Sequence, residues 1–187
     1  MSAFGADLTA AVLQTLYFFA PAYIANMTPV LVRGTLHRLA TPIDGGRTFR
    51  GVRLLGDHKT WRGLLAGTVV GVVAFQLQVA LWDAGVLRRL ALVDYASLGP
   101  LAGFLMGLGA GVGDAVKSFF KRQLGIAPGA SWLVFDQLDF MAGAYALVAL
   151  AHVPPLVPTL LCLPIVLVGS VATTATGWTL GLKEAWI

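Results

Sequence analysis

Three aspartates in the second half of the chain have the residue type and spacing that metal-dependent phosphate chemistry needs. Asp114 follows a glycine-rich apolar run in "GVGDAVKSFFKR", and Asp136 and Asp139 lie three residues apart in "FDQLDF". On a helix, residues i and i+3 share one face, so this pair projects together. Three converging carboxylates with few neutralising neighbours repel one another, and Mg2+ would relieve that repulsion and bridge to phosphates. We predict that all three aspartates bind Mg2+.

Cations and a hydroxyl group follow Asp114 at helical spacing. Lys117, Ser118 and Lys121 come three, four and seven residues after it and share its face, and Arg122 lies one turn beyond Ser118. These groups suit a polyphosphate. Two simpler interpretations stay open: the cations anchor the chain at a membrane surface, and the later acidic pair stabilises a helix start through the macrodipole.

A second basic segment, "PIDGGRTFRGVRLLGDHKTWRGLLAG", combines four glycines for tight turns with five cations for phosphate contact. Its last part stands just before an apolar helix, whose first N–H groups favour an anion. A loop that binds lipid headgroups is the alternative interpretation. We predict that the segment clamps a nucleotide through Asp57, His58, Lys59 and Arg62, with Asp44 as a weaker candidate.

The elements that hold these residues are apolar enough to lie in a membrane. Hydrophobic residues make up 57% of the chain and charged residues 12%, and the mean hydropathy is +0.79. Uncharged stretches of about 18 or more residues indicate spanning helices. We predict an all-α polytopic membrane protein with five transmembrane helices: 8–32, 63–82, 95–113, one from about 132, and one after the prolines at 154–158.

The distribution of Lys and Arg predicts the orientation. Eleven of these residues flank one side of the predicted spans, and only Arg88 and Arg89 flank the other. We therefore expect the N-terminus outside and the C-terminus in the cytoplasm. The chain is then a single membrane-embedded catalytic domain, residues 1–187, in the cell membrane. Its cytoplasmic loops, at about 38–62 and 118–135, place the active site on the cytoplasmic side.

Five segments together resemble one known family. "PAYIANMTPVLV", "PIDGG", "LLGDHKTWRGLLAG", "GDAVKSFFKRQLGIAPG" and "DQLD", in that order, are similar to the CDP-archaeol synthase family, the archaeal membrane cytidylyltransferases. The region around the acidic pair is also distantly similar to phosphatidate cytidylyltransferases. It departs from them at Gln137, where arginine is usual, and it lacks their His-Gly-Gly. These departures argue against phosphatidate as the substrate and leave the reaction type unchanged.

The resemblance implies Mg2+-dependent transfer of CMP from CTP to 2,3-bis-O-geranylgeranylglycerol 1-phosphate, an unsaturated isoprenoid ether-lipid phosphate. We expect CTP, this lipid and membrane lipids as partners and no nucleic acid, and the oligomeric state stays open. The lipid would enter sideways, through a groove around Met106, Phe119, Phe120 and Phe140. A small membrane transporter and a non-enzymatic lipid-binding protein remain alternatives. The expected catalytic residues are Asp114, Asp136, Asp139, Lys121 and Lys59, and the expected CTP-binding residues are Asp44, Asp57, His58, Lys59, Arg62, Lys117, Ser118, Lys121 and Arg122.

Overall fold

The computed structural model describes residues 3–127, 130, 132 and 134–179, and this part of the chain is almost entirely helical. Its only sheet is one short antiparallel hairpin. The elements in chain order are α1 (Ala3–Phe18), α2 (Ala20–Leu31), η1 (His37–Leu39), β1 (Thr48–Phe49), β2 (Val52–Arg53), α3 (Trp61–Asp83), η2 (Arg88–Leu90), α4 (Tyr95–Gln123), α5 (Phe135–Val148) and α6 (Leu156–Thr179).

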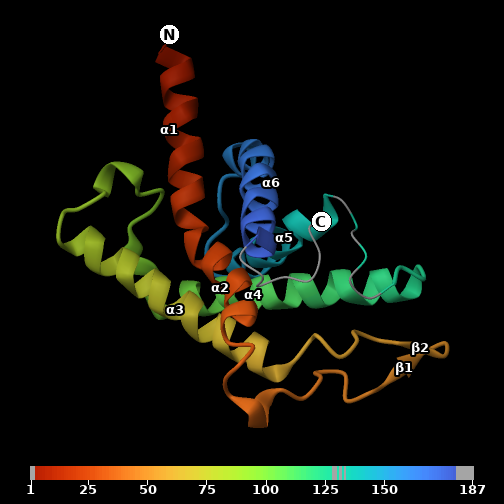
Figure 1. The fold of residues 1–187 in the computed structure, drawn as a ribbon. Helices are drawn as coiled ribbons and strands as arrows, with labels where there is room; N and C mark the ends of the chain where they lie inside the picture. The colour runs from red at the N-terminus through yellow and green to blue at the C-terminus, as the bar shows by residue number, and fades with distance from the viewer. Residues whose placement is uncertain (1–2, 128–129, 131, 133, 180–187) are drawn as a thin grey trace.

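Helix α4 is the centre of the molecule (Figure 1). It packs against α2, α3 and α5, while α1 pairs with α6. Small residues allow the close crossing of α3 and α4, since a Cβ atom on Gly107 would lie only 2.9 Å from Cα of Thr68. Phe75 and Met106 are fully buried at this crossing, with 0% exposure each. The glycine-rich run before Asp114 thus allows close packing of α4 against α3.

The first apolar segment is not the single helix that we predicted over 8–32. It breaks at Phe19 into α1 and α2, and the two helices are bent by 40°. Pro21 stands in the first turn of α2, where its missing N–H group costs nothing within that helix. The same residue cannot continue the hydrogen-bond ladder of α1. The prediction failed because a proline inside an apolar stretch permits a bent helix as well as a straight one.

Helix α4 is also longer than the predicted span 95–113. It continues to Gln123, so the cations from Lys117 to Arg122 lie on the helix, and the loop expected from residue 118 begins later. Lys121 and Arg122 stand in the last turn, where cations offset the negative end of the helix dipole. Gly125 follows with a φ of +72°, a conformation that commonly ends a helix.

The C-terminal part matches the predicted break between two helices. Asp136 lies in the first turn of α5, and Pro154 and Pro155 separate α5 from α6. A hydrogen bond of 3.1 Å from the Tyr145 hydroxyl to the Pro154 carbonyl ties this turn to α5.

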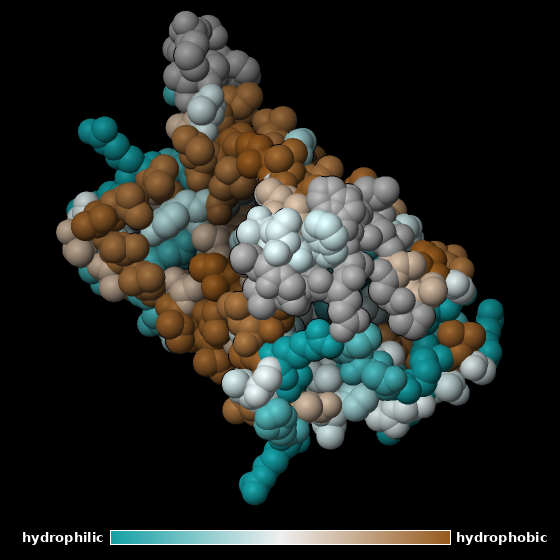
Figure 2. Space-filling model, viewed as in Figure 1, coloured by the Kyte–Doolittle hydropathy of each residue, from teal (hydrophilic) through white to brown (hydrophobic). Residues whose placement is uncertain are grey.

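Two helices, α3 and α4, are long and apolar enough to cross a membrane, and the bent pair of α1 and α2 is a third candidate. Helices α5 and α6 contribute shorter apolar stretches, Leu138–Val148 and Leu156–Gly169. The prediction of five spans and of their orientation stays a prediction. Figure 2 shows apolar side chains over the helices and hydrophilic ones along the lower edge, where Figure 1 places the segment with β1 and β2.

The segment between α2 and α3 is an ordered loop that lies beside α4 (Figure 1). Its hairpin turns at Arg50 and Gly51. Their φ angles of 53° and 80° are typical of a type I′ turn, the common two-residue connection between antiparallel strands. The Phe49 ring packs against Phe119 of α4, with ring centroids 6.1 Å apart. At its end, Thr60 caps α3 by accepting the Gly63 N–H at 3.3 Å.

Candidate active site

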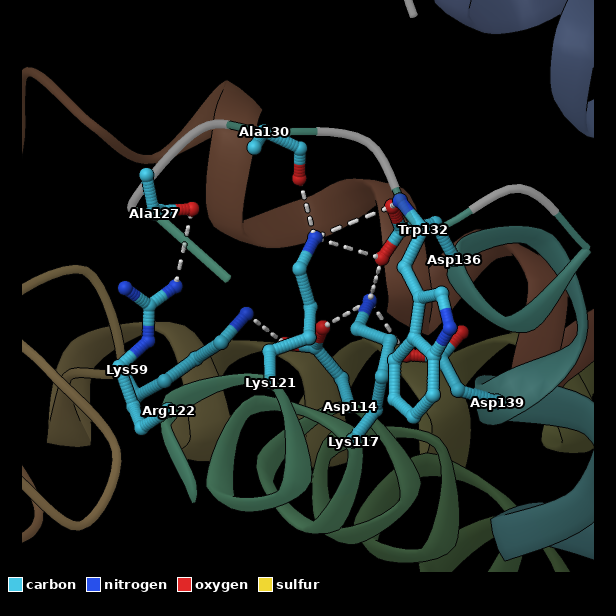
Figure 3. Close-up of polar contacts among 10 residues, drawn as sticks. All are labelled: Lys59, Asp114, Lys117, Lys121, Arg122, Ala127, Ala130, Trp132, Asp136 and Asp139. Carbon is cyan, nitrogen blue, oxygen red and sulfur yellow. Dashed lines mark hydrogen bonds and ion pairs between the residues drawn. The ribbon is translucent and has the colours of Figure 1, made fainter. Parts of the chain in front are cut away.

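The three predicted aspartates converge on one lysine, as Figure 3 shows. Nζ of Lys117 on α4 lies 3.0 Å from Oδ1 of Asp114, one helical turn away. The same atom lies 3.2 Å from Oδ1 of Asp136 and 2.8 Å from Oδ2 of Asp139, both on α5. The spacing of these residues thus places three carboxylates around a single ammonium group.

Two further lysines complete this charged cluster, which we define as the three aspartates with Lys59, Lys117 and Lys121. Lys59 reaches in from the α2–α3 loop and pairs with Asp114. Lys121 lies 3.1 Å from Asp136 and also donates to the Ala130 carbonyl. The expectation of few neutralising neighbours is therefore wrong. Three ammonium groups balance three carboxylates, because Lys59 arrives from a segment 55 residues away in sequence.

Asp139 is the most buried member of the charged cluster, with a side chain that is 5% exposed. Within the described part of the chain, its ion pair is with Lys117, whose Nζ lies 2.8 Å from Oδ2. A buried carboxylate with so few partners is costly for the fold. Such a residue beside an apolar span indicates a functional site.

Close packing of α4 against α5 brings the charges together. A Cβ atom on Gly113 would overlap the backbone carbonyl of Asp139, and one on Gly143 would lie 2.8 Å from Cα of Gly113. The two backbones can approach this closely only because both positions are glycine. Asp139 therefore lies beside Lys117.

Backbone groups from the α4–α5 connection also hold the charged cluster. The Trp132 N–H donates to Oδ2 of Asp136 at 2.6 Å, and the Ala130 carbonyl accepts from Lys121. The sequence analysis missed these two contacts, because a backbone group has no residue type that could reveal it.

Several predicted nucleotide-binding residues lie at the rim with other partners. Asp57 is 77% exposed and pairs with Arg53 at 2.9 Å. Arg62 donates to the Thr35 carbonyl at 2.9 Å, away from the aspartates. Four predicted residues remain. His58 is exposed, and Arg122 donates to the Ala127 carbonyl at 3.5 Å. Ser118 is buried on the cluster face of α4, and Asp44 is buried within the α2–α3 loop.

A small cavity of about 80 Å3 adjoins the charged cluster on the side of the α2–α3 loop. Asn26, His58 and Lys59 line it together with Asp114. Asn26 is the only asparagine in the chain. Asn26 thus lies beside the Lys59 and Asp114 pair of the charged cluster.

A much larger apolar cavity, of about 780 Å3, lies between α4, α5 and α6. Lys117 and Asp139 contribute to its lining, so one end of this cavity is charged. Of the four residues predicted to line a lipid groove, Phe120 does so. Phe119 borders a separate cavity of about 590 Å3 beside the α2–α3 loop, and Phe140 borders one of about 290 Å3 between α1, α2 and α6. Met106 is buried in the core. Which of these cavities holds lipid stays a prediction.

Comparison with known sequences decides the family. The sequence profile of the CarS-like CDP-archaeol synthases matches residues 8–187. The chain belongs to the CDP-archaeol synthase family. Among its relatives, the CDP-archaeol synthase of Halobacterium salinarum is 41% identical over 96% of this chain and 99% of the relative. The CDP-archaeol synthase of Pyrococcus furiosus is 37% identical over 81% of this chain and 84% of the relative.

A solved structure supports the same assignment. It is described as an intramembrane enzyme for archaeal membrane lipids biosynthesis, and it is 36% identical to this chain with a TM-score of 0.65. The match covers 87% of this chain and 93% of that one. Membership of the CDP-archaeol synthase family makes the chain an enzyme of the cytidylyltransferase class. It decides against the transporter and the non-enzymatic lipid-binding protein.

Proposed function

We propose that this chain transfers CMP from CTP to 2,3-bis-O-geranylgeranylglycerol 1-phosphate in a Mg2+-dependent reaction that releases pyrophosphate. The observation that carries the proposal is the place of Lys117 and Asp139, which belong both to the charged cluster and to the lining of the apolar cavity. Isoprenoid chains in that cavity would present their phosphate to the cations. Family membership supports the nucleotide and the lipid class.

The reaction needs no side-chain nucleophile. An oxygen of the lipid phosphate attacks the α-phosphorus of CTP, the new P–O bond forms, and the bond from that phosphorus to the β-phosphate oxygen breaks. Pyrophosphate then leaves with the electron pair of the broken bond. The protein must hold two polyanions in line and offset the charge that accumulates between them.

The lysines of the charged cluster divide this work by position. Lys117 borders the apolar cavity and would orient the lipid phosphate. Lys59 and Lys121 flank the aspartates from the loop and from the end of α4, where they would bind the triphosphate and the leaving pyrophosphate. Further nucleotide contacts would come from the rim residues His58, Ser118 and Arg122, and from Asp57 and Arg62 once these two release their present partners.

The three aspartates would hold Mg2+. Their carboxylates surround one point, and hard oxygen ligands are what this ion prefers. In the described part of the chain, no group of three acidic, histidine or cysteine side chains is placed to bind one metal ion, and Lys117 occupies the space between the three aspartates. The ion would supply positive charge at the phosphates. Lys117 would then have to move away from the carboxylates.

The proposed topology has five spans, the N-terminus outside and the active site on the cytoplasmic side of the cell membrane. The excess of Lys and Arg beside the α2–α3 loop and the end of α4 supports it. CTP is a cytoplasmic nucleotide, so an active site on this side has direct access to it.

The test uses purified protein in detergent with CTP, Mg2+ and the geranylgeranylated glycerol phosphate, and phosphatidate as a parallel substrate. Pyrophosphate release and a CDP-lipid product are followed together. We expect product from the ether lipid and little from phosphatidate. Absence of product from both lipids, in protein with an intact thermal transition, would overturn the proposal.

The metal assignment has its own variant. Asp139→Asn should lower the rate by about 100-fold or more, as expected when a charge that acts on the transition state is removed. Asp83→Asn is the matched control, because Asp83 is exposed at the far end of α3 and should behave as wild type. Full activity of Asp139→Asn with unchanged Mg2+ dependence would show that Asp139 is no metal ligand.

A further inference from the structure

Asp44, in the α2–α3 loop, is the most completely hydrogen-bonded carboxylate of the described residues. Its side chain is 1% exposed. Oδ1 accepts from NH2 of Arg53 at 2.9 Å and from the Gly46 N–H at 3.0 Å. Oδ2 accepts from the Leu55 N–H at 3.0 Å, the Gly56 N–H at 3.1 Å and Nε of Arg53 at 3.3 Å. We call these contacts the Asp44 clasp.

The clasp joins the two ends of the segment that carries the hairpin. Gly46 stands before β1, and Leu55 and Gly56 follow β2. One carboxylate therefore closes the base of the hairpin from both sides. Arg53 extends the clasp outward, since its guanidinium also pairs with Asp57 at 2.9 Å.

The clasp is connected directly to Lys59 of the charged cluster. The Gly56 carbonyl accepts from the Lys59 N–H at 3.3 Å, and the Lys59 carbonyl accepts from the N–H of Ile43, the residue before Asp44, at 2.8 Å. The backbone of Lys59 is thus held on both sides by residues next to the clasp. From this position its side chain reaches Asp114 on α4.

We propose that Asp44 is a positioning residue: the Asp44 clasp fixes the loop so that Lys59 meets Asp114, and Asp44 itself touches no nucleotide. Every hydrogen bond that its two oxygens make is internal to the loop. Asp44 borders a cavity of about 590 Å3, but its two oxygens already accept from five donors, so a phosphate or ribose would have to displace one of these donors to bind them. This inference replaces the sequence-based expectation that Asp44 contacts the nucleotide. It rests on the proposed function only where the test measures kcat/KM.

The electrostatics of Asp44 agree with this geometry. Burial alone would raise the pKa of its carboxyl, but Arg53 and the three backbone N–H groups hold that pKa well below its usual range. The contribution of the clasp to stability is therefore fully present above the unfolded pKa of about 4 and is lost only as the pH falls toward the lower folded value. At neutral pH the clasp is closed.

A double-mutant cycle tests the proposal. Asp44→Asn removes the charge and places an amide N–H group against the backbone N–H groups and the guanidinium that now donate to Asp44. It should therefore lower kcat/KM by about tenfold or more. Lys59→Met should lower it by about 30-fold or more. If Asp44 acts through Lys59, the double variant should match Lys59→Met within about threefold. The proposal would be overturned if the loss of kcat/KM in the double variant equalled the product of the two single losses. It would also be overturned if Asp44→Asn raised the KM for CTP and left kcat unchanged.

A second readout does not depend on activity. Trypsin cleavage at Arg50 and Arg53, in the hairpin, should be at least about tenfold faster in Asp44→Asn than in wild type, because an opened clasp frees the loop. Asp83→Asn is the matched control and should be cleaved at the wild-type rate. Equal cleavage of Asp44→Asn and wild type would overturn the proposal. A wild-type protein without transferase activity would instead refute the proposed function and leave the cleavage test intact.

The reciprocal exchange distinguishes the clasp from a simple ion pair. The double variant Asp44→Arg with Arg53→Asp keeps both charges but offers no acceptor to the Gly46, Leu55 and Gly56 N–H groups. Its cleavage at Arg50, a site that both variants keep, should be as fast as in Asp44→Asn. Recovery of wild-type resistance would show that the ion pair alone holds the loop, which would overturn the proposed clasp.

Discussion

Lys117 occupies the space between three carboxylates. With the other two lysines it makes the formal charge of the cluster zero, so a free divalent cation gains little by entering. We predict that wild-type protein binds Mn2+ weakly without CTP. Lys117→Met should bind Mn2+ at least about tenfold more tightly, because it leaves three carboxylates with two cations. Titration followed by electron paramagnetic resonance measures this directly.

Arg38→Met is the control for that titration. Arg38 is exposed in η1 and contacts none of the three aspartates among the described residues, so its loss changes the net charge without changing the cluster. Its Mn2+ affinity should equal that of wild type. If Lys117→Met bound Mn2+ no better than Arg38→Met, the three aspartates would not form a metal site.

At this scale the sequence predicted part of the charged cluster well. Helical spacing correctly placed Lys117 and Lys121 on the face of Asp114, and Asp136 and Asp139 together on the next helix. It did not reveal the pairing of Lys59 with Asp114, because contacts between separate elements depend on how the chain folds back. The sequence also does not show that Asp44 has its hydrogen-bond partners within its own loop, because these depend on how the loop folds.

The contact between α4 and α5 holds the two halves of the charged cluster in register. Gly113→Ala would place a methyl group against the Asp139 carbonyl and push the helices apart. Overpacking of this kind costs about 1–3 kcal/mol. We predict a lower midpoint of thermal unfolding in detergent and a loss of activity of at least about tenfold, because Asp139 moves away from Lys117.

Gly34→Ala is the matched change in open space, since no atom lies within 4 Å of a Cβ built at Gly34. It should leave both the unfolding midpoint and the activity at wild-type values. A Gly113→Ala variant that is as active as Gly34→Ala would mean that the cluster tolerates a shift of α5.

Helix boundaries were predictable where charge or proline marks them clearly. The start of α3 and the break before α6 follow such residues, and both agree with the structure. The break at Phe19 was not predicted, and the predicted span 95–113 stopped short of Gln123 although the cations after Asp114 have helical spacing. The local sequence allows a straight or a bent helix at Phe19, and a helix that ends near residue 113 or continues. Packing against neighbouring helices selects one outcome in each case.

Over the whole molecule, the length of α3 predicts that the charged α2–α3 loop and the connection that carries η2 lie on different sides of the membrane. Helix α3 has 23 residues. At a rise of 1.5 Å per residue it spans about 34 Å, which exceeds the hydrocarbon thickness of about 30 Å. The hairpin precedes this helix and η2 follows it. One helix thus separates the active-site loop from Arg88 and Arg89, whichever way the protein is inserted.

Cysteine labelling tells which side is which. Cys162 is the only cysteine in the chain, so Cys162→Ala provides a background without a thiol. In sealed right-side-out vesicles, an impermeant maleimide should label Leu87→Cys, which precedes η2, and leave Arg50→Cys at the hairpin turn unlabelled. Inverted vesicles should give the opposite pattern, and both positions should react in detergent because both are exposed. Labelling of Arg50→Cys from the outside would place the charged cluster away from the cytoplasmic nucleotide pool and refute the proposed orientation.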